Sequence, residues 1–164
     1  MTENELDEIA WEYRNRLAVE AVLLDYCELV DALDYQGIAN LFSEDCEFDL
    51  GFGRVNRGRE GIFKQMSTRM PIEYTHTSHH LSNIRIRFEG HEQAHASSYV
   101  FAWHRQASDG KERKLFGRYY DDLVETAEGW KIRRRRLVAA GEDGYPPAQG
   151  QSGPFELIPR GERR

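Results

Sequence analysis

A succession of strand patterns in the second half of the chain constrains the fold most. In the stretch EYTHTSHHLSNIRIRF, Ile84, Ile86 and Phe88 alternate with arginines, which is the period of two that a half-buried strand requires. Turn sequences at Glu89-Gly90, Ser108-Asp-Gly and Ala127-Glu-Gly separate similar stretches. The predicted strands span residues 75–88, 94–106, 114–126 and 130–140. Together they predict an antiparallel meander.

The first half of the chain is predominantly helical. Between residues 6 and 33, apolar side chains recur at spacings of three and four without an intervening Pro or Gly. A short helix over 35–42 with Asp34 as its N-cap and a helix over 59–70 closed by Pro71 follow, with a strand over 43–50 between them. Helices followed by a meander predict an α+β fold, with the helices on one face of a curved antiparallel sheet. A pocket is expected between the concave face and the first helix.

Length and composition limit the possible functions. With 164 residues, 40% hydrophobic and 30% charged, we expect one domain over 1–141 and an irregular, Gly- and Pro-rich tail over 142–164. The net charge of −6 argues against nucleic-acid binding and favours a small apolar, aromatic or polycyclic ligand. There is no secretory h-region or membrane-length apolar run, so we expect a cytoplasmic protein with no membrane partner. Cys27 and Cys46 are expected to be reduced thiols in the core.

Two motifs suggest functions that their context does not support. His91-Glu-Gln-Ala-His95 matches the H-E-x-x-H pattern of zinc proteases, but it runs from a turn into a strand. Two histidines four positions apart on a strand are separated by roughly 13 Å, too far to share a metal ion. The basic run Arg133 to Arg136 is predicted to split into two pairs on opposite faces of a strand, so it forms no single basic surface.

A histidine paired with a carboxylate is the catalytic group that the sequence favours. His79 and His80 fall on opposite faces of the predicted strand, so one of them points inward, where a histidine can transfer protons. Asp31 and Asp34, near the end of the first helix, are the candidate partners; Asp34 fits the helical wheel better, but it is also well placed as a cap. No nucleophile elbow, phosphate loop or dinucleotide motif is present, so we expect no cofactor and no metal.

Several segments resemble one known family. The segments Tyr26-Cys-Glu-Leu-Val-Asp31-Ala-Leu-Asp34, His79-His-Leu-Ser-Asn83, Gly117-Arg-Tyr119-Tyr-Asp121 and Gly129-Trp-Lys-Ile are similar to SnoaL-like proteins of the nuclear-transport-factor superfamily, in consistent order from Val19 to Val138. The resemblance implies a cone-shaped α+β barrel of the cystatin-like type with a deep apolar cavity, usually in an oligomer. Relatives such as scytalone dehydratase, bile-acid dehydratase and hexachlorocyclohexane dehydrochlorinase use a His-Asp pair to remove a proton without a cofactor.

Carried over residue by residue, the resemblance makes His79 the base, Asp31 its partner and Tyr26 a polar residue on the helix. Tyr119 and Arg135 match cavity positions, and Tyr26 stands where the dehydrochlorinase has a lysine, which favours a dehydratase. His104 on a neighbouring strand is a candidate second acid or ligand contact.

The leading hypothesis is therefore a cofactor-free lyase or isomerase that acts on a small cyclic substrate and forms a dimer or trimer. The alternative is a ligand-binding or structural subunit like the small subunit of aromatic-ring-hydroxylating dioxygenases.

Overall fold

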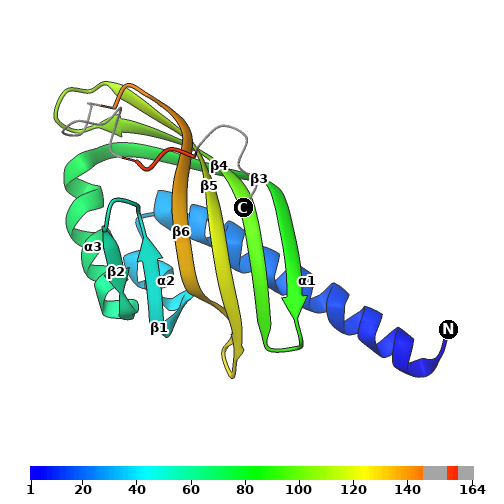
Figure 1. Ribbon diagram of the computed structural model, residues 1–164. Helices are drawn as coiled ribbons and strands as arrows, with labels where there is room; N and C mark the ends of the chain where they lie inside the picture. The colour runs from blue at the N-terminus through cyan, green and yellow to red at the C-terminus, as the bar shows by residue number, and fades with distance from the viewer. Residues whose placement is uncertain (146–154, 159–164) are drawn as a thin grey trace.

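The computed structural model describes residues 1–145 and 155–158, with three helices followed by most of the sheet (Figure 1). In chain order the elements are α1 (Glu3–Asp31), α2 (Tyr35–Asn40), β1 (Phe42–Asp49), β2 (Val55–Arg57), α3 (Gly58–Glu73), β3 (Tyr74–Glu89), β4 (Gln93–Gln106), β5 (Glu112–Thr126) and β6 (Gly129–Asp143).

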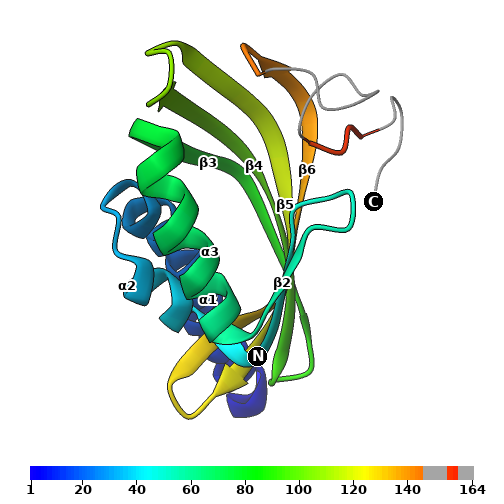
Figure 2. The same cartoon turned by 90° about the vertical axis from the view of Figure 1, so that its left-hand side faces the viewer.

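The helices form one layer and the sheet the other. Figure 2 shows α1, α2 and α3 together on the concave side of the curved sheet. The six strands are ordered β2-β1-β6-β5-β4-β3, and every neighbouring pair is antiparallel except β1 and β6, which are parallel. The predicted α+β, cystatin-like architecture is confirmed. The sheet is open, and the parallel pairing of β1 with β6 was not predicted.

The end of α1 determines which aspartate enters the interior. A capping box between Thr2 and Glu5 starts the helix, and its buried stripe includes Val19, Leu23, Tyr26 and Val30. The chain then reverses through Leu33, whose φ of 58° is left-handed. As predicted, Asp34 caps α2 by accepting a hydrogen bond from the Gly37 backbone N–H at 2.8 Å. The Asp34 carboxylate is therefore engaged as a helix cap, whereas Asp31, the last residue of α1, is the aspartate that can reach the cavity.

The differences from the prediction include the ends of two helices and one short strand that the sequence did not reveal. α3 does not stop at Pro71 but includes it and ends at Glu73. A proline removes one backbone donor, and in the final turn this loss does not break the helix. α2 ends at Asn40, and the fully buried Phe42 starts β1. The three-residue β2, which pairs with β1, was too short to be recognised from alternation.

The predicted division of the arginine run into two opposite pairs is wrong. In the pairing of β5 with β6, Asp121 is opposite Arg135 and Asp122 opposite Arg134, but Leu123 is opposite Ile132. Arg133 is therefore the extra residue of a bulge, which turns its side chain outward. Arg135 alone of the four is buried.

The sheet extends further toward the C-terminus than predicted. β6 runs to Asp143, and residues 155–158, drawn in red in Figure 1, lie along it. The Ala139 N–H donates to the Glu156 carbonyl and the Ile158 N–H to the Ala139 carbonyl, each at 2.8 Å. Of the predicted tail, residues 146–154 and 159–164 lie outside the described part of the chain.

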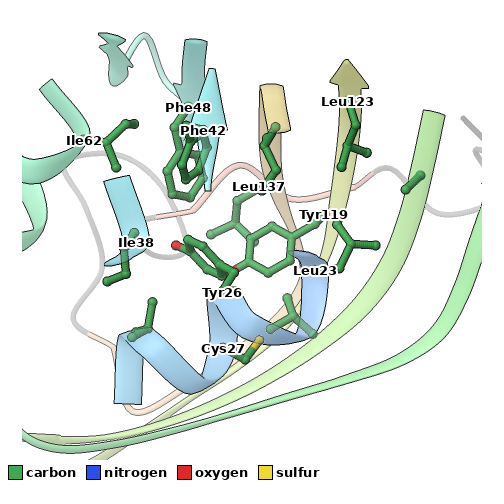
Figure 3. Packing of buried hydrophobic residues seen from close by; sticks show 14 of the residues in the cluster. Leu23, Tyr26, Cys27, Ile38, Phe42, Phe48, Ile62, Tyr119, Leu123 and Leu137 are labelled. Carbon is green, nitrogen blue, oxygen red and sulfur yellow. The ribbon is translucent and has the colours of Figure 1, made fainter. Parts of the chain in front are cut away.

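Aromatic side chains fill the core beside the first helix. Tyr26 packs edge-on against Phe42, Phe48 and Tyr119, with ring centroids 5.8–6.2 Å apart (Figure 3). Cys27 and Cys46 are buried free thiols. No helix within the described residues is long and apolar enough to cross a membrane.

Candidate active site

A cavity of about 260 Å³ lies between α1, α3 and the concave face of the sheet. Apolar side chains form much of its wall, and histidines, tyrosines and two arginines supply the polar atoms. Its lining residues include Tyr26, Val30, Phe48, Met66, Met70, His79, Ala102, His104, Leu115, Tyr119, Leu137, Tyr145 and Phe155. A site of this kind suits a small, mostly apolar ligand.

His79 and Asp31 meet at this cavity. His79 Nδ1 lies 2.7 Å from Asp31 Oδ1, and the His79 backbone N–H donates to Oδ2 at 2.8 Å. The His79 side chain is only 8% exposed, whereas His80 is on the opposite, exposed face of β3. Because Nδ1 is held by the carboxylate, Nε2 is the nitrogen available to a ligand. The predicted contact between His79 and Asp31 is therefore present.

Several donors hold the Asp31 carboxylate. Besides His79, the Thr77 hydroxyl donates to Oδ1 at 2.7 Å. Burial alone would raise the pKa of Asp31, but the hydrogen bonds from His79 and Thr77 outweigh it and keep this pKa below its ordinary value. Thr77 was not predicted, although it lies two residues before His79 and therefore on the same face of the strand.

Two tyrosine rings form part of the cavity wall. Tyr26 and Tyr119 are each 3% exposed and line the cavity. Burial raises the pKa of Tyr26 to about 12, against the opposing effect of the Arg135 charge, and raises that of Tyr119 well above its ordinary value. Both hydroxyls therefore stay protonated at neutral pH and can donate hydrogen bonds.

Arg135 lies outside the cavity lining, behind these tyrosines. Its guanidinium forms two hydrogen bonds with the Asp121 carboxylate, at 2.7 and 3.1 Å, and both residues are buried. The guanidinium carbon is 4.2 Å from the Tyr26 ring centroid and 4.3 Å from that of Tyr119. Arg135 thus supports the cavity wall through the two rings. It is not among the residues that line the cavity, so the prediction that Arg135 contacts a ligand is not supported.

His104 completes the polar end of the cavity. Its ring centroid is 5.1 Å from that of His79, and its Nδ1 is 2.8 Å from the Tyr145 hydroxyl oxygen. Burial, followed by the proximity of His79, lowers the pKa of His104 to about 3. His104 is therefore neutral at physiological pH. Tyr145 was not predicted because it lies in the segment that was expected to be irregular.

The two histidines of the H-E-x-x-H motif, His91 and His95, do not line the cavity and contact other side chains. His91 stacks on Trp11 and contacts Glu8, while His95 lies between Asp122 at 2.7 Å and Glu89 at 3.0 Å. Within residues 1–145 and 155–158, no group of three or more His, Cys, Asp or Glu side chains is arranged to hold a metal ion.

The chain belongs to the SnoaL-like family. The model of the SnoaL-like domain matches residues 11–136, which include the His79–Asp31 pair. An uncharacterized protein of Mycobacterium tuberculosis is 30% identical over 128 residues, which cover 76% of this chain and 84% of that protein.

Solved structures extend the similarity. A putative scytalone dehydratase from Novosphingobium aromaticivorans matches with a TM-score of 0.85 and 28% identity, over 94% of this chain and 99% of that one. A putative aromatic ring hydroxylase from the same organism matches with a TM-score of 0.70 and 29% identity, over 76% and 88% of the two chains. The protein therefore has a fold that is shared with dehydratase-like proteins.

Proposed function

We propose that this protein is a cofactor-free lyase or isomerase that removes a proton from a small apolar cyclic substrate. The observation that carries the proposal is the 2.7 Å contact between His79 Nδ1 and Asp31 Oδ1 at the edge of an apolar cavity. It presents an oriented histidine nitrogen to a bound molecule, as a general base requires. The similarity to a putative scytalone dehydratase supports the same class of reaction.

Each group has a defined role in an elimination. His79 Nε2 takes a proton from a substrate carbon, and the electrons of the C–H bond form the new double bond as the leaving hydroxyl departs. Asp31 keeps the proton on Nδ1 and stabilises the imidazolium. Tyr26 or Tyr119 donates a hydrogen bond to a substrate oxygen. The proton held by His79 then passes to the departing hydroxide, so that water is released.

Turnover and proton exchange test this proposal. Hydroxylated aromatic, polycyclic and steroid-like compounds would be incubated with the protein in heavy water, and mass spectrometry would follow loss of water and deuterium uptake at carbon. His79→Ala should lower either rate roughly 10²- to 10⁴-fold, the usual contribution of a general base. Asp31→Asn should cost on the order of 10²-fold or more through loss of tautomer control.

The matched control is His80→Ala. His80 is the next residue on β3, but its exposed ring stacks on Phe101 on the other face of the sheet. This variant should keep full activity. If His79→Ala leaves exchange and elimination unchanged in the folded protein, the proposal fails. Compounds that bind tightly but never react would instead favour the ligand-binding or subunit role.

We also expect a homo-oligomer. The N-terminal part of α1 extends beyond the sheet (Figure 1), and Leu6, Ile9, Tyr13 and Leu17 follow one another along it at helical spacing, each about half exposed or more. Such an apolar stripe is typical of a surface that another chain covers. Light scattering should therefore give a multiple of the 19.1 kDa chain mass, and a mass of one chain would contradict this expectation.

A further inference from the structure

The start of α1 has little support from its own chain. Residues 1–10 are all exposed, and the first partly buried side chain of the helix is Trp11, whose ring lies edge-on to that of Phe88 at 5.0 Å. Short helices are marginally stable in water, and in proteins the packing of an apolar face stabilises them. In this part of α1 that face is the α1 stripe, which consists of the exposed residues Leu6, Ile9, Tyr13 and Leu17. Another chain is therefore needed to cover it.

A second apolar surface lies on the convex side of the sheet. The three helices are on the concave side, so no helix of the described chain covers the convex face (Figure 2). Since Ala102 lines the cavity, its strand neighbour Phe101 points to the convex side. Phe101 is opposite Phe116 on β5, with ring centroids 5.2 Å apart, and Phe116 is 48% exposed. Two aromatic rings in contact are thus presented to the exterior.

A tyrosine and an arginine extend this surface along the same strands. Tyr99 is 44% exposed, and the guanidinium carbon of Arg118 lies 4.5 Å from its ring centroid. Together with the two phenylalanines they form the aromatic patch: Tyr99, Phe101, Phe116 and Arg118. Aromatic residues and arginine are the types enriched where one protein binds another. The patch therefore has the composition of an interface.

The two surfaces carry opposite charges. Residues 1–12 contain no Lys or Arg and five acidic residues: Glu3, Glu5, Asp7, Glu8 and Glu12. On the sheet, Arg85 is opposite Ser97, which is two positions from Tyr99 and on the same face. Within the described part of the chain, neither Arg85 nor Arg118 forms an ion pair or a hydrogen bond. Their charges are thus available to an acidic partner.

We propose that the α1 stripe of one copy packs on the aromatic patch of the next copy, so that the copies close into a ring. Each chain uses its helix for one contact and its sheet for the other, which is a heterologous interface. The arrangement covers both apolar surfaces and brings the acidic residues of α1 to Arg85 and Arg118. Helix-on-helix packing would instead bring two sets of carboxylates together, and sheet-on-sheet packing would leave the α1 stripe exposed.

The dimensions of the two surfaces agree. From Leu6 to Leu17 the stripe spans roughly 17 Å at 1.5 Å per residue. From Ser97 to Phe101 the strand that carries the patch spans roughly 13 Å, and three adjacent strands are about 10 Å across, close to the width of a helix. One helix can therefore cover the patch. The inference rests on the expected homo-oligomer and is independent of the proposed reaction.

Two variants that each damage one surface test the contact. Leu6→Glu/Ile9→Glu makes the stripe polar with residues that favour a helix. Tyr99→Thr/Phe116→Thr removes two rings of the patch with residues that suit a strand. Light scattering should give each variant alone the mass of one chain. An equal mixture should form a species of two chains, because the intact helix of one variant can pack on the intact sheet of the other.

The matched control is Phe63→Glu/Ile72→Glu, which changes two exposed apolar residues of α3 outside both surfaces and should keep the unmodified mass. If the helix variant stays associated, sheets pack on sheets and the inference is overturned. If the sheet variant stays associated, helices pack on helices, with the same consequence. Two variants that remain single chains when mixed would also overturn it, as would a loss of mass in the control.

A milder change tests the role of charge. Arg118→Glu, added to the helix variant with its intact sheet, should weaken the mixed two-chain species on the order of tenfold, and added salt should weaken it further. A Kd that neither change alters would overturn the assignment of the acidic helix as the partner. An unmodified protein with the mass of one chain would refute the homo-oligomer and this contact together. Turnover tests the lyase proposal separately.

Discussion

Removing one member of the Arg135–Asp121 pair should destabilise the protein more than removing both. Asp121→Ala leaves a guanidinium that cannot lose its proton, buried between Tyr26 and Tyr119. Breaking a buried pair in this way costs about 3–5 kcal/mol. For a chain of this length, each kcal/mol lowers Tm by roughly 2–4 °C, so we expect a fall of roughly 6–20 °C.

The Arg135→Met variant and the double variant should both be more stable than Asp121→Ala. Arg135→Met leaves Asp121, which can become neutral by taking up a proton. Burial raises the pKa of Asp121 in the folded protein, and without Arg135 nothing nearby opposes this. A folded-state pKa above the unfolded value contributes stability at low pH that is lost as pH rises, so the defect of Arg135→Met should grow with pH. The double variant Asp121→Leu/Arg135→Met should lie within about 2 kcal/mol of the unmodified protein.

Urea unfolding followed by tryptophan fluorescence and circular dichroism would measure these differences. Equal slopes with denaturant would show that the unfolded states are comparable. A double variant as unstable as Asp121→Ala would show that side-chain volume, and not uncompensated charge, determines the loss. A cost below about 1 kcal/mol for Asp121→Ala would refute the estimate from burial.

Two further predictions concern histidines with shifted pKa values. The pKa of His104 is lowered from 6.5 to about 3 in the folded protein. Below pH 6.5 the unfolded chain therefore binds a proton that the folded protein does not. As the pH decreases, the free energy of unfolding should fall by up to about 1.4 kcal/mol per pH unit. Stability curves between pH 5 and 7 should show this slope, and His104→Gln should remove it; an equal slope in the variant contradicts the assignment. His95 donates hydrogen bonds to the carboxylates of Glu89 and Asp122, which raise its pKa, so NMR titration should place the pKa of His95 above 6.5, and Asp122→Asn should lower it. An unchanged His95 titration midpoint in Asp122→Asn would show that Asp122 does not raise the pKa of His95.

Strand alternation predicted the orientation of the two adjacent histidines well. Alternation along the strand placed His79 and His80 on opposite faces, and in the structure His79 faces the cavity and His80 the exterior. This works because strand periodicity is a local property of the chain. The choice between Asp31 and Asp34 was not local. It depended on a left-handed Leu33, which reverses the chain after Asp31 and which a helical wheel cannot show.

Other parts of the site could not be predicted because they depend on pairing between distant segments. Arg135 points inward because a bulge opposite Asp122 and Leu123 changes the register of β6, and no residue pattern marks that bulge. Tyr145 reaches His104 only because β6 continues to Asp143 and residues 155–158 pack beside it. Local patterns therefore predicted most of the elements and the opposite orientation of His79 and His80, and long-range pairing determined the rest of the cavity.

The docking of residues 155–158 on β6 has a consequence for which parts of the chain shape the cavity. Tyr145 and Phe155 line the cavity, yet both lie beyond residue 136, where the match to the SnoaL-like domain ends. The cavity wall is thus built from two parts, one inside the family domain with His79 and Asp31, and one that follows it. Because the appended part contacts neither His79 nor Asp31 through any hydrogen bond of the described residues, its substitution can reshape the cavity while the pair stays intact. Substitutions at a few residues after β6 can therefore change the shape of the cavity without removing any hydrogen bond of the pair.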